Sequence, residues 1–235
     1  MPDATTQLPP TGRHELPELL TLDPGVRTVG SLSEKAYYLL RDRLITLEVA
    51  PGATIDERAL QDELGLGRTP IREALRRLAD DRLVEVVPRR GMFASPVHLG
   101  DLRAISEVRV QLEGHAARLA ARRAREADVV VAEELIRQLG EPAADQRDLM
   151  RLDQRVHRFV HRLTYNDFLA ATLEEYYVHS LRLWFLVLDH LPHLEHAVGE
   201  HIDLLSAIRD GDADAAERIA RAHVAEFSDR IRVVL

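Results

Sequence analysis

Residues 67–80 read GRTPIREALRRLAD, and this pattern predicts a short amphipathic helix. From Ile71 onward, apolar residues recur at positions i, i+3, i+4 and i+7, which places them on one helical face. Thr69 is a good N-cap residue, and Pro70 suits the first helical position because its missing N–H would be unpaired there. We therefore expect a helix from about residue 69 to residue 80, with one face in a small core.

A second face of this helix carries positive charge. Arg68, Arg72 and Arg76 are four residues apart, and the interval from Arg68 to Arg77 holds four arginines against the single acid Glu73. A helix fits the major groove of DNA, where guanidinium groups pair with guanine edges and phosphates. Arginines at this spacing are also typical of an exposed helix with many salt bridges. The neighbouring segments have to decide between the two interpretations.

The flanking segments favour the DNA-reading interpretation. A first helix, capped by Ser31 or Ser33, ends at the turn 50–52, and two apolar runs follow the arginine-rich helix around a turn that contains Gly91. The predicted order is a helix before residue 50, helices over 57–64 and 69–80, and strands over 84–87 and 92–95. This is the order of a winged helix-turn-helix, three helices plus a two-stranded wing, which we place at residues 31–98.

Beyond residue 98 the pattern predicts helices only. Six amphipathic stretches, separated by short breaks, cover residues 99–124, 126–139, 145–164, 167–190, 199–209 and 213–233. The expected fold class is therefore mainly α, with the winged helix-turn-helix followed by an all-α antiparallel helical bundle over residues 99–235. Residues 1–30 mix prolines, threonines and charges without a helical or strand period, which predicts a flexible leader.

Composition limits the possible functions of these 235 residues. Cysteine is absent, so disulfides and cysteine-ligated zinc are excluded. We find no run of eighteen apolar residues and no secretion signal, so we expect a cytoplasmic protein with no membrane partner. The net charge of −8 is unusual for a DNA-binding protein. However, residues 34–98 hold 11 basic and 11 acidic residues, leaving 20 against 28 elsewhere, so a locally basic face remains possible.

Four polar residues lie on the apolar faces of three predicted bundle helices. Asp153 and His157 are i and i+4 and share a face with leucine and valine, while His201 and His223 fall on the apolar stripes of two other helices. Burying such groups requires compensation, which a divalent ion with nitrogen and oxygen ligands supplies. His161, one turn beyond His157, is an alternative ligand. Ligand type alone does not separate zinc from nickel, cobalt or manganese.

The motifs of the first domain resemble those of the GntR family of bacterial regulators. They are residues 50–52 (APG), 57–60 (ERAL), 67–75 (GRTPIREAL) and 77–78 (RL), followed by Gly91. The resemblance implies that the residues in contact with DNA are Arg58, Arg68, Thr69, Arg72, Arg90 and Gly91. It also implies a homodimer that binds a palindromic operator in double-stranded DNA.

The helical part resembles the FCD subgroup of that family, in its metal-containing type. The motifs are residues 109–113 (RVQLE), 153–157 (DQRVH), 200–201 (EH) and 222–223 (AH). The resemblance implies a bundle with a central cavity in which a small organic acid completes the coordination of a metal ion, zinc being the first choice. The implied ligands are Asp153, His157, His201 and His223. Arg109 is the candidate partner of the acid because its fork matches two carboxylate oxygens, and an interhelical salt bridge is the alternative.

The residues and the resemblance together predict a transcription regulator whose operator affinity changes when a small carboxylate binds at the metal. The resemblance favours a repressor, and activation remains an alternative. Two other interpretations remain. One is a regulator for which the metal ion is itself the signal, and the other is a metal-dependent hydrolase that uses the ion to activate water. A hydrolase lacks a convincing general base beside the four ligands and leaves the winged helix unexplained. We therefore assign no catalytic residues and expect no enzymatic activity.

Overall fold

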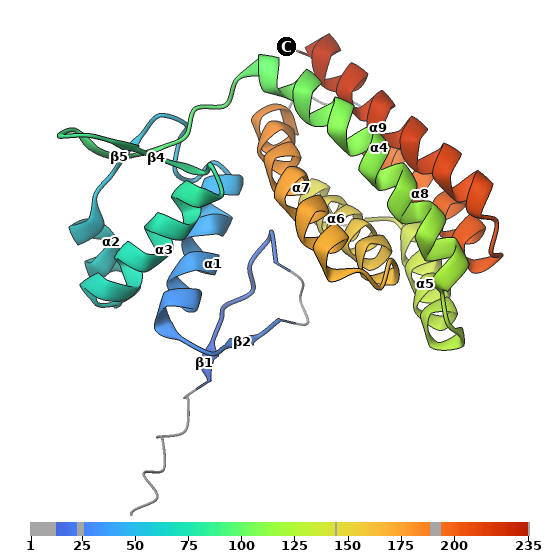
Figure 1. Ribbon diagram of the computed structural model, residues 1–235, viewed down its shortest axis with the longest axis horizontal. Helices are drawn as coiled ribbons and strands as arrows, with labels where there is room; N and C mark the ends of the chain where they lie inside the picture. Colours follow the sequence, from blue (N-terminus) through green and yellow to red (C-terminus); the bar gives the residue numbers. More distant parts are fainter. Residues whose placement is uncertain (1–12, 23–25, 144, 189–193, 235) are drawn as a thin grey trace, which may run out of the picture. The chain divides into compact units, whose positions relative to one another are not determined.

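The computed structural model describes residues 13–22, 26–143, 145–188 and 194–234 (Figure 1). The chain divides into two compact units. The first holds the chain up to Arg43 together with Gly52–Ser95, and the second holds Leu44–Pro51 together with the chain from Pro96 onward. The break after Ser95 lies close to the domain boundary that the sequence predicts after residue 98.

Local hydrogen bonds mark the starts of the first two helices. The three helices before residue 81 are α1 (Leu32–Ile45), α2 (Glu57–Leu64) and α3 (Arg68–Asp80). The Ser31 hydroxyl accepts from a backbone N–H in the first turn of α1, and the Asp56 carboxylate accepts from two such groups in α2. Gly65 ends α2 in the left-handed region, with φ of 63°. The predicted range of α2 is therefore confirmed.

The helix α3 begins at Arg68, two residues before Pro70, the predicted first helical position. Gly67 occupies the N-cap position without a side-chain hydrogen bond, so the prediction that Thr69 caps this helix was wrong. Pro70 is the third helical residue, and its missing N–H still costs nothing because the first four N–H groups of a helix have no intrahelical partner. The apolar stripe is confirmed, since its members are fully buried: Ile71, Ala74, Leu75 and Leu78.

The wing is part of a three-stranded antiparallel sheet. β4 (Val84–Val87) and β5 (Gly91–Ala94) pair around a tight turn, and β3 (Thr54–Ile55) pairs with the other edge of β5, giving the order β3-β5-β4. The sequence predicts only two strands here. A two-residue strand such as β3 carries no alternation of polar and apolar residues, so its pairing partner is visible only in the folded chain.

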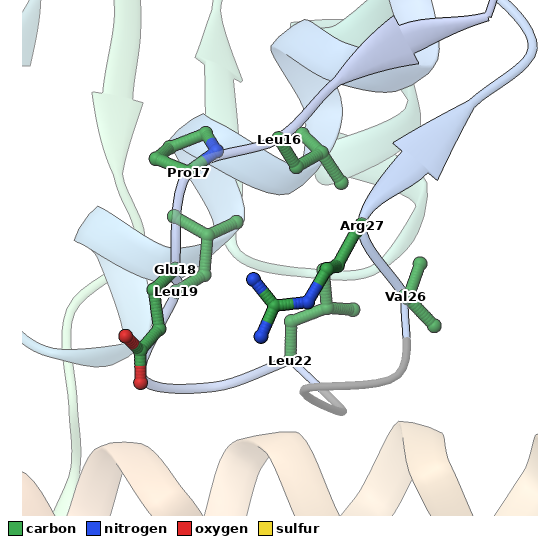
Figure 2. A pocket seen from close by; sticks show the side chains of 7 residues that line it. All are labelled: Leu16, Pro17, Glu18, Leu19, Leu22, Val26 and Arg27. Carbon is green, nitrogen blue, oxygen red and sulfur yellow. The ribbon is translucent and has the colours of Figure 1, made fainter.

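The segment before α1 carries structure that the sequence does not predict. β1 (His14–Glu15) and β2 (Thr28–Val29) pair as a short antiparallel ribbon, and the backbone N–H and hydroxyl of Thr21 both donate to Asp42 Oδ1, at 2.7 and 2.8 Å. Within the predicted flexible leader, residues 13–22 and 26–30 thus include a short ribbon that the sequence does not indicate, while residues 1–12 lie outside the described chain. A small pocket in the loop that connects the two strands is lined by Leu16, Pro17, Glu18, Leu19, Leu22, Val26 and Arg27 (Figure 2).

Among the described residues of the second unit, the chain beyond Pro96 forms six helices and no strand. They are α4 (Leu99–Arg123), α5 (Glu126–Leu139), α6 (Gln146–Leu163), α7 (Asp167–Val187), α8 (Leu194–Arg209) and α9 (Ala213–Val234). α4 lies along α9 (Figure 1), α5 packs against α8, and α6 and α7 both contact α4. The helix α8 begins at Leu194, five residues before the predicted start at residue 199. No helix in the described part of the chain is both long and apolar enough to span a bilayer.

The core of this unit places α6, α8 and α9 close together. Small residues line the inner face of α4, where Ala116, Ala117 and Ala120 are fully buried, and larger side chains from the other helices fill the space beside them. Leu205 of α8 and Val156 of α6 belong to this core and are both completely buried. Any polar side chain on the same helix faces is therefore withdrawn from water.

Candidate DNA-binding surface and metal centre

The residues expected to contact DNA all lie exposed on the first unit. Arg58 is on α2, Arg68, Thr69 and Arg72 are on α3, and Arg90 and Gly91 are on the wing. The buried stripe of α3 turns the opposite face, with its arginines, toward solvent. Such an exposed basic helix with a neighbouring wing has the geometry needed to enter a major groove.

Two arginines of this region have partners that define their roles. The guanidinium of Arg77 stacks on the ring of Tyr37 at 3.7 Å from its centroid, and the Tyr37 hydroxyl donates to Asp81 at 2.7 Å. Arg77 therefore helps to fasten α3 to α1. Arg72 differs, because its Nε donates to the Glu57 carboxylate at 2.6 Å and its side chain stays partly exposed.

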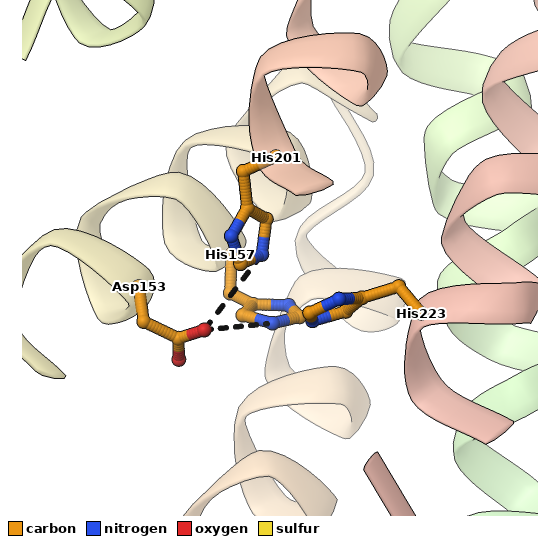
Figure 3. A group of neighbouring side chains, drawn as sticks. All are labelled: Asp153, His157, His201 and His223. Atoms are coloured by element: carbon orange, nitrogen blue, oxygen red, sulfur yellow. Dashed lines mark ion pairs between the residues drawn. The ribbon is translucent and has the colours of Figure 1, made fainter. Parts of the chain in front are cut away.

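In the second unit, the four predicted metal ligands come together. Asp153 and His157 lie on α6, His201 on α8 and His223 on α9. All four residues are more than nine-tenths buried. Their side chains point toward one another (Figure 3), and one ligand atom from each lies within 4.8 Å of the others. The i, i+4 pair on α6 and the histidines on the two apolar stripes therefore meet in the fold, as predicted.

Each of the three histidines has an oxygen beside its Nδ1. His201 Nδ1 donates to the carbonyl oxygen of Val198 at 3.0 Å, and His223 Nδ1 lies 2.9 Å from a carboxylate oxygen of Glu200. His157 Nδ1 faces a Glu113 carboxylate oxygen at 3.5 Å. Because these oxygens accept hydrogen bonds, they favour the tautomer with the proton on Nδ1 and a lone pair on Nε2. This is the tautomer that a metal bound at Nε2 requires.

Asp153 supplies the oxygen of the cluster. Its Oδ2 accepts from the Tyr177 hydroxyl at 2.8 Å, while its Oδ1 lies 3.8 Å from His157 Nε2 and 3.7 Å from His201 Nε2. His201 Nε2 is buried and has no hydrogen-bond partner. A buried nitrogen without a hydrogen bond destabilises the fold by about 1–3 kcal/mol. A cation bound between this nitrogen, the carboxylate and the two other imidazoles would offset that loss.

Burial keeps His201 and His157 neutral at physiological pH. Desolvation and the neighbouring His223 lower the pKa of His201 to about 3, against the opposing charge of Asp153. Desolvation likewise lowers the pKa of His157, although Glu113 and Asp153 act in the other direction. Burial and the charge of Asp153 raise the pKa of Tyr177 well above 10, so its hydroxyl remains a donor. His201 and His157 can therefore accept a cation without first losing protons.

A second buried group lies next to the cluster and was not predicted as functional. Glu113 of α4 accepts from Arg109 Nη2 at 2.7 Å, and its other oxygen lies 3.0 Å from His161 Nε2. Burial raises the pKa of Glu113, but His161, His157 and Arg109 outweigh this and hold it well below its usual range. The predicted alternative ligand His161 is thus placed against Glu113, outside the set of four.

Arg109 is buried within the same unit, only 3% exposed. The salt bridge considered as the alternative role is present but intrahelical, since Glu113 lies four residues along α4. It leaves Arg109 Nε buried without a hydrogen-bond partner, and the guanidinium lies 5.1 Å from the centroid of the Tyr177 ring. Spacing in the sequence could have revealed the Arg109–Glu113 pair, but only the fold reveals its proximity to His157.

Comparison with known proteins agrees with both units. Residues 32–94 match the bacterial regulatory proteins of the gntR family, and residues 104–226 match the FCD domain. The chain belongs to the GntR family. It is an FCD-type member, and its helix-turn-helix makes it a DNA-binding transcription regulator.

The sequence similarity between this GntR regulator and its relatives extends over most of the chain. The HTH-type transcriptional repressor RspR of Escherichia coli K12 is 25% identical over 219 residues, which cover 92% of this chain and 95% of RspR. An HTH-type transcriptional regulator of Streptomyces ambofaciens, from an unstable DNA locus, is 32% identical over 216 residues, covering 88% and 89%. These relatives are regulators, so the hydrolase interpretation gains no support from them.

Solved structures show the same fold. Escherichia coli McbR/YncC superposes on this GntR regulator with a TM-score of 0.74 at 21% identity, covering 88% of this chain and 97% of that one. A GntR regulator from Rhodococcus sp. RHA1 gives a TM-score of 0.67 at 17% identity, covering 86% and 98%. At this identity the likeness concerns architecture only.

Proposed function

We propose that this GntR regulator binds a divalent metal ion in its FCD domain and that a small carboxylate bound at the metal changes its affinity for operator DNA. The observation that carries the proposal is the buried set of one carboxylate and three imidazoles, with His201 Nε2 lacking any hydrogen-bond partner. Repression relieved by the acid is the expected sense. The protein would act in the cytoplasm as a homodimer on a palindromic operator.

The metal would be held by Asp153, His157, His201 and His223. Nitrogen and oxygen donors of this kind suit zinc first, and also nickel, cobalt and manganese. The ion would supply a positive centre that accepts further oxygen ligands. The oxygens beside each Nδ1 support this assignment, because ligand histidines characteristically donate their second N–H to a carbonyl or carboxylate.

Arg109 would bind the carboxylate effector. Its Nε is buried without a hydrogen-bond partner, although the neighbouring Glu113 takes one of its Nη atoms. An anion that reaches both Arg109 and the metal would satisfy this nitrogen with a charge-assisted hydrogen bond. The same anion would shift the regulator between two arrangements only to the extent that it binds them with different affinity.

On the DNA side, Arg58, Arg68, Thr69, Arg72, Arg90 and Gly91 would contact the operator. Their exposure on α2, α3 and the wing supports this. Arginine pairs bidentately with guanine, whereas a threonine or a wing residue fixes the backbone of the duplex.

The decisive experiment measures metal content and melting temperature of the purified full-length protein. Mono-, di- and tricarboxylates are added one at a time, with and without chelator, to the wild type, to His201→Ala and to the matched control His115→Ala, in which an exposed histidine is removed. We expect about one metal ion per chain in the wild type and control, a rise in melting temperature with one acid class, and loss of both in His201→Ala. Full occupancy in His201→Ala would overturn the metal assignment.

A second candidate function shares this site. If the ion alone is the signal, zinc at micromolar concentration would change operator affinity and no acid would change it further. Operator binding titrated with zinc, first without and then with the stabilising acid, separates the two functions.

A further inference from the structure

Arg72 of α3 is held by a carboxylate from the preceding helix, α2. Arg72 Nε of α3 donates to Glu57 Oε2 of α2 at 2.6 Å, and Glu57 is the first residue of its helix. Glu57 is half-buried, with 25% of its side chain exposed, whereas 44% of the Arg72 side chain is exposed. The acid is therefore the better fixed of the two partners, and it limits where the guanidinium can lie.

This contact determines which edge of Arg72 remains for DNA. A guanidinium offers five N–H donors in a planar fork, and it can meet guanine either through Nε and one Nη or through both Nη atoms. Because Glu57 occupies Nε, the end formed by Nη1 and Nη2 is the part left to pair with the O6 and N7 atoms of guanine. The contact also restricts in advance the rotamers of a long side chain, which lowers the ordering cost of binding.

The charge of Glu57 acts against simple attraction to DNA. A carboxylate beside the reading helix repels phosphates, so it weakens the sequence-independent part of binding. A surface that served only to hold the DNA backbone would bind better without it. The pair therefore weakens sequence-independent attraction to DNA while it fixes one arginine. Removing Glu57 should change these two contributions to DNA affinity in opposite directions.

We propose that Glu57 is a positioning residue for DNA specificity, which acts by holding the Arg72 guanidinium so that its two Nη atoms face a guanine edge. The inference rests on Arg72 being a DNA contact. It predicts that losing Glu57 lowers affinity for the operator while raising, or leaving unchanged, affinity for unrelated DNA.

Glu63 provides a matched control. It lies on the same helix α2, is exposed, and pairs with Arg43 of α1 at 2.9 Å, away from Arg72's ion pair. Glu57→Ala and Glu63→Ala remove the same charge from the same helix, and the Asp56 cap of α2 remains in both variants. Melting temperatures close to that of the wild type would establish that both variants fold.

The test uses full-length protein and a duplex selected by the wild type from a random pool of double-stranded DNA. Affinity is measured for the selected duplex and for a scrambled duplex of the same composition, and their ratio defines specificity. We expect Glu57→Ala to lower the ratio about three- to tenfold, the scale of losing a preordered side chain, and Glu63→Ala to leave it unchanged. Glu57→Gln, which keeps an acceptor oxygen, should recover part of the ratio.

A double variant shows whether Glu57 acts through Arg72. Once Arg72→Ala is present, adding Glu57→Ala should not lower the ratio further. Equal losses in Glu57→Ala and Glu63→Ala, an unchanged ratio in Glu57→Ala, or an additive loss in the double variant would each overturn the inference. If Arg72→Ala itself keeps the full ratio, the assignment of Arg72 as a DNA contact fails instead.

Discussion

His201 Nε2 lies 3.7 Å from Asp153 Oδ1, buried and without a hydrogen-bond partner, while the Nδ1 of the same ring donates to Val198. The ring is thus fixed at one nitrogen and unsatisfied at the other. The unsatisfied nitrogen faces Asp153 Oδ1. At 3.7 Å the two atoms are too far apart for a hydrogen bond, so they could share a proton only by moving closer together. A cation between them would satisfy both without such a movement.

The metal-free protein should lose stability as the pH falls below about 6.5. The folded-state pKa of His201 is about 3, against an ordinary value of 6.5, so between these values the unfolded chain binds a proton that the folded chain does not. This lowers the free energy of unfolding by up to about 1.4 kcal/mol for each pH unit below 6.5. Urea titrations at pH 7 and pH 5 measure the slope, and His201→Gln should flatten it. An identical slope in wild type and variant would contradict the assignment.

Glu113→Gln should weaken metal binding although Glu113 is not expected to be a ligand. The variant removes the charge that faces His157 Nδ1 and accepts from Arg109, so the orientation of His157 and its basicity as a ligand both suffer. Loss of such a supporting contact typically lowers metal affinity about 10- to 100-fold. Competition with a chromophoric chelator measures the affinity. Glu107→Gln, an exposed acid of the same helix, is the control and should retain wild-type affinity.

Arg72→Ala should weaken specific binding to a selected duplex by about 1–3 kcal/mol, because one good arginine–guanine contact is lost. Fluorescence anisotropy at fixed salt measures the affinity, with Arg147→Ala as the control, since Arg147 is an exposed arginine of the second unit. Unchanged binding in Arg72→Ala would remove this residue from the DNA-binding set.

Thr21→Val should loosen the segment that precedes α1. The hydroxyl of Thr21 donates to the Asp42 carboxylate at 2.8 Å, and a hydrogen bond to a charged group contributes about 1.5–3 kcal/mol. Because the backbone N–H of residue 21 still reaches Asp42, the segment should open more often rather than detach. Trypsin cleavage at Arg27 should therefore accelerate about ten- to a hundredfold at constant protease concentration, while Thr28→Val, on the exposed side of β2, should not change it. Equal cleavage rates would contradict the role of the hydroxyl.

The cluster of candidate metal ligands could be predicted because the position of each residue on its own helix follows from the local sequence. The i, i+4 relation of Asp153 and His157 and the apolar stripes that carry His201 and His223 are written in the local sequence, and burial then brings the faces together. The supporting groups follow no such rule. Glu113 reaches His157 from another helix, so its pairing is a product of tertiary packing alone.

The errors in the predicted fold have a similar origin. β3 and the β1–β2 ribbon consist of two-residue strands, which are too short to show a period. Thr69 is an adequate cap residue by its chemistry, but Gly67 takes the extended conformation that starts α3. Where a feature depends on partners distant in the chain, composition and spacing leave it undetermined.

The burial of all four candidate ligands would also affect how fast a bound metal ion exchanges. With no exposed ligand to begin exchange, an ion held by α6, α8 and α9 would leave only when one of these helices moves outward, so its residence would follow the opening rate of the bundle. A regulator that senses zinc itself, the second candidate function, would then respond only as fast as the bundle opens.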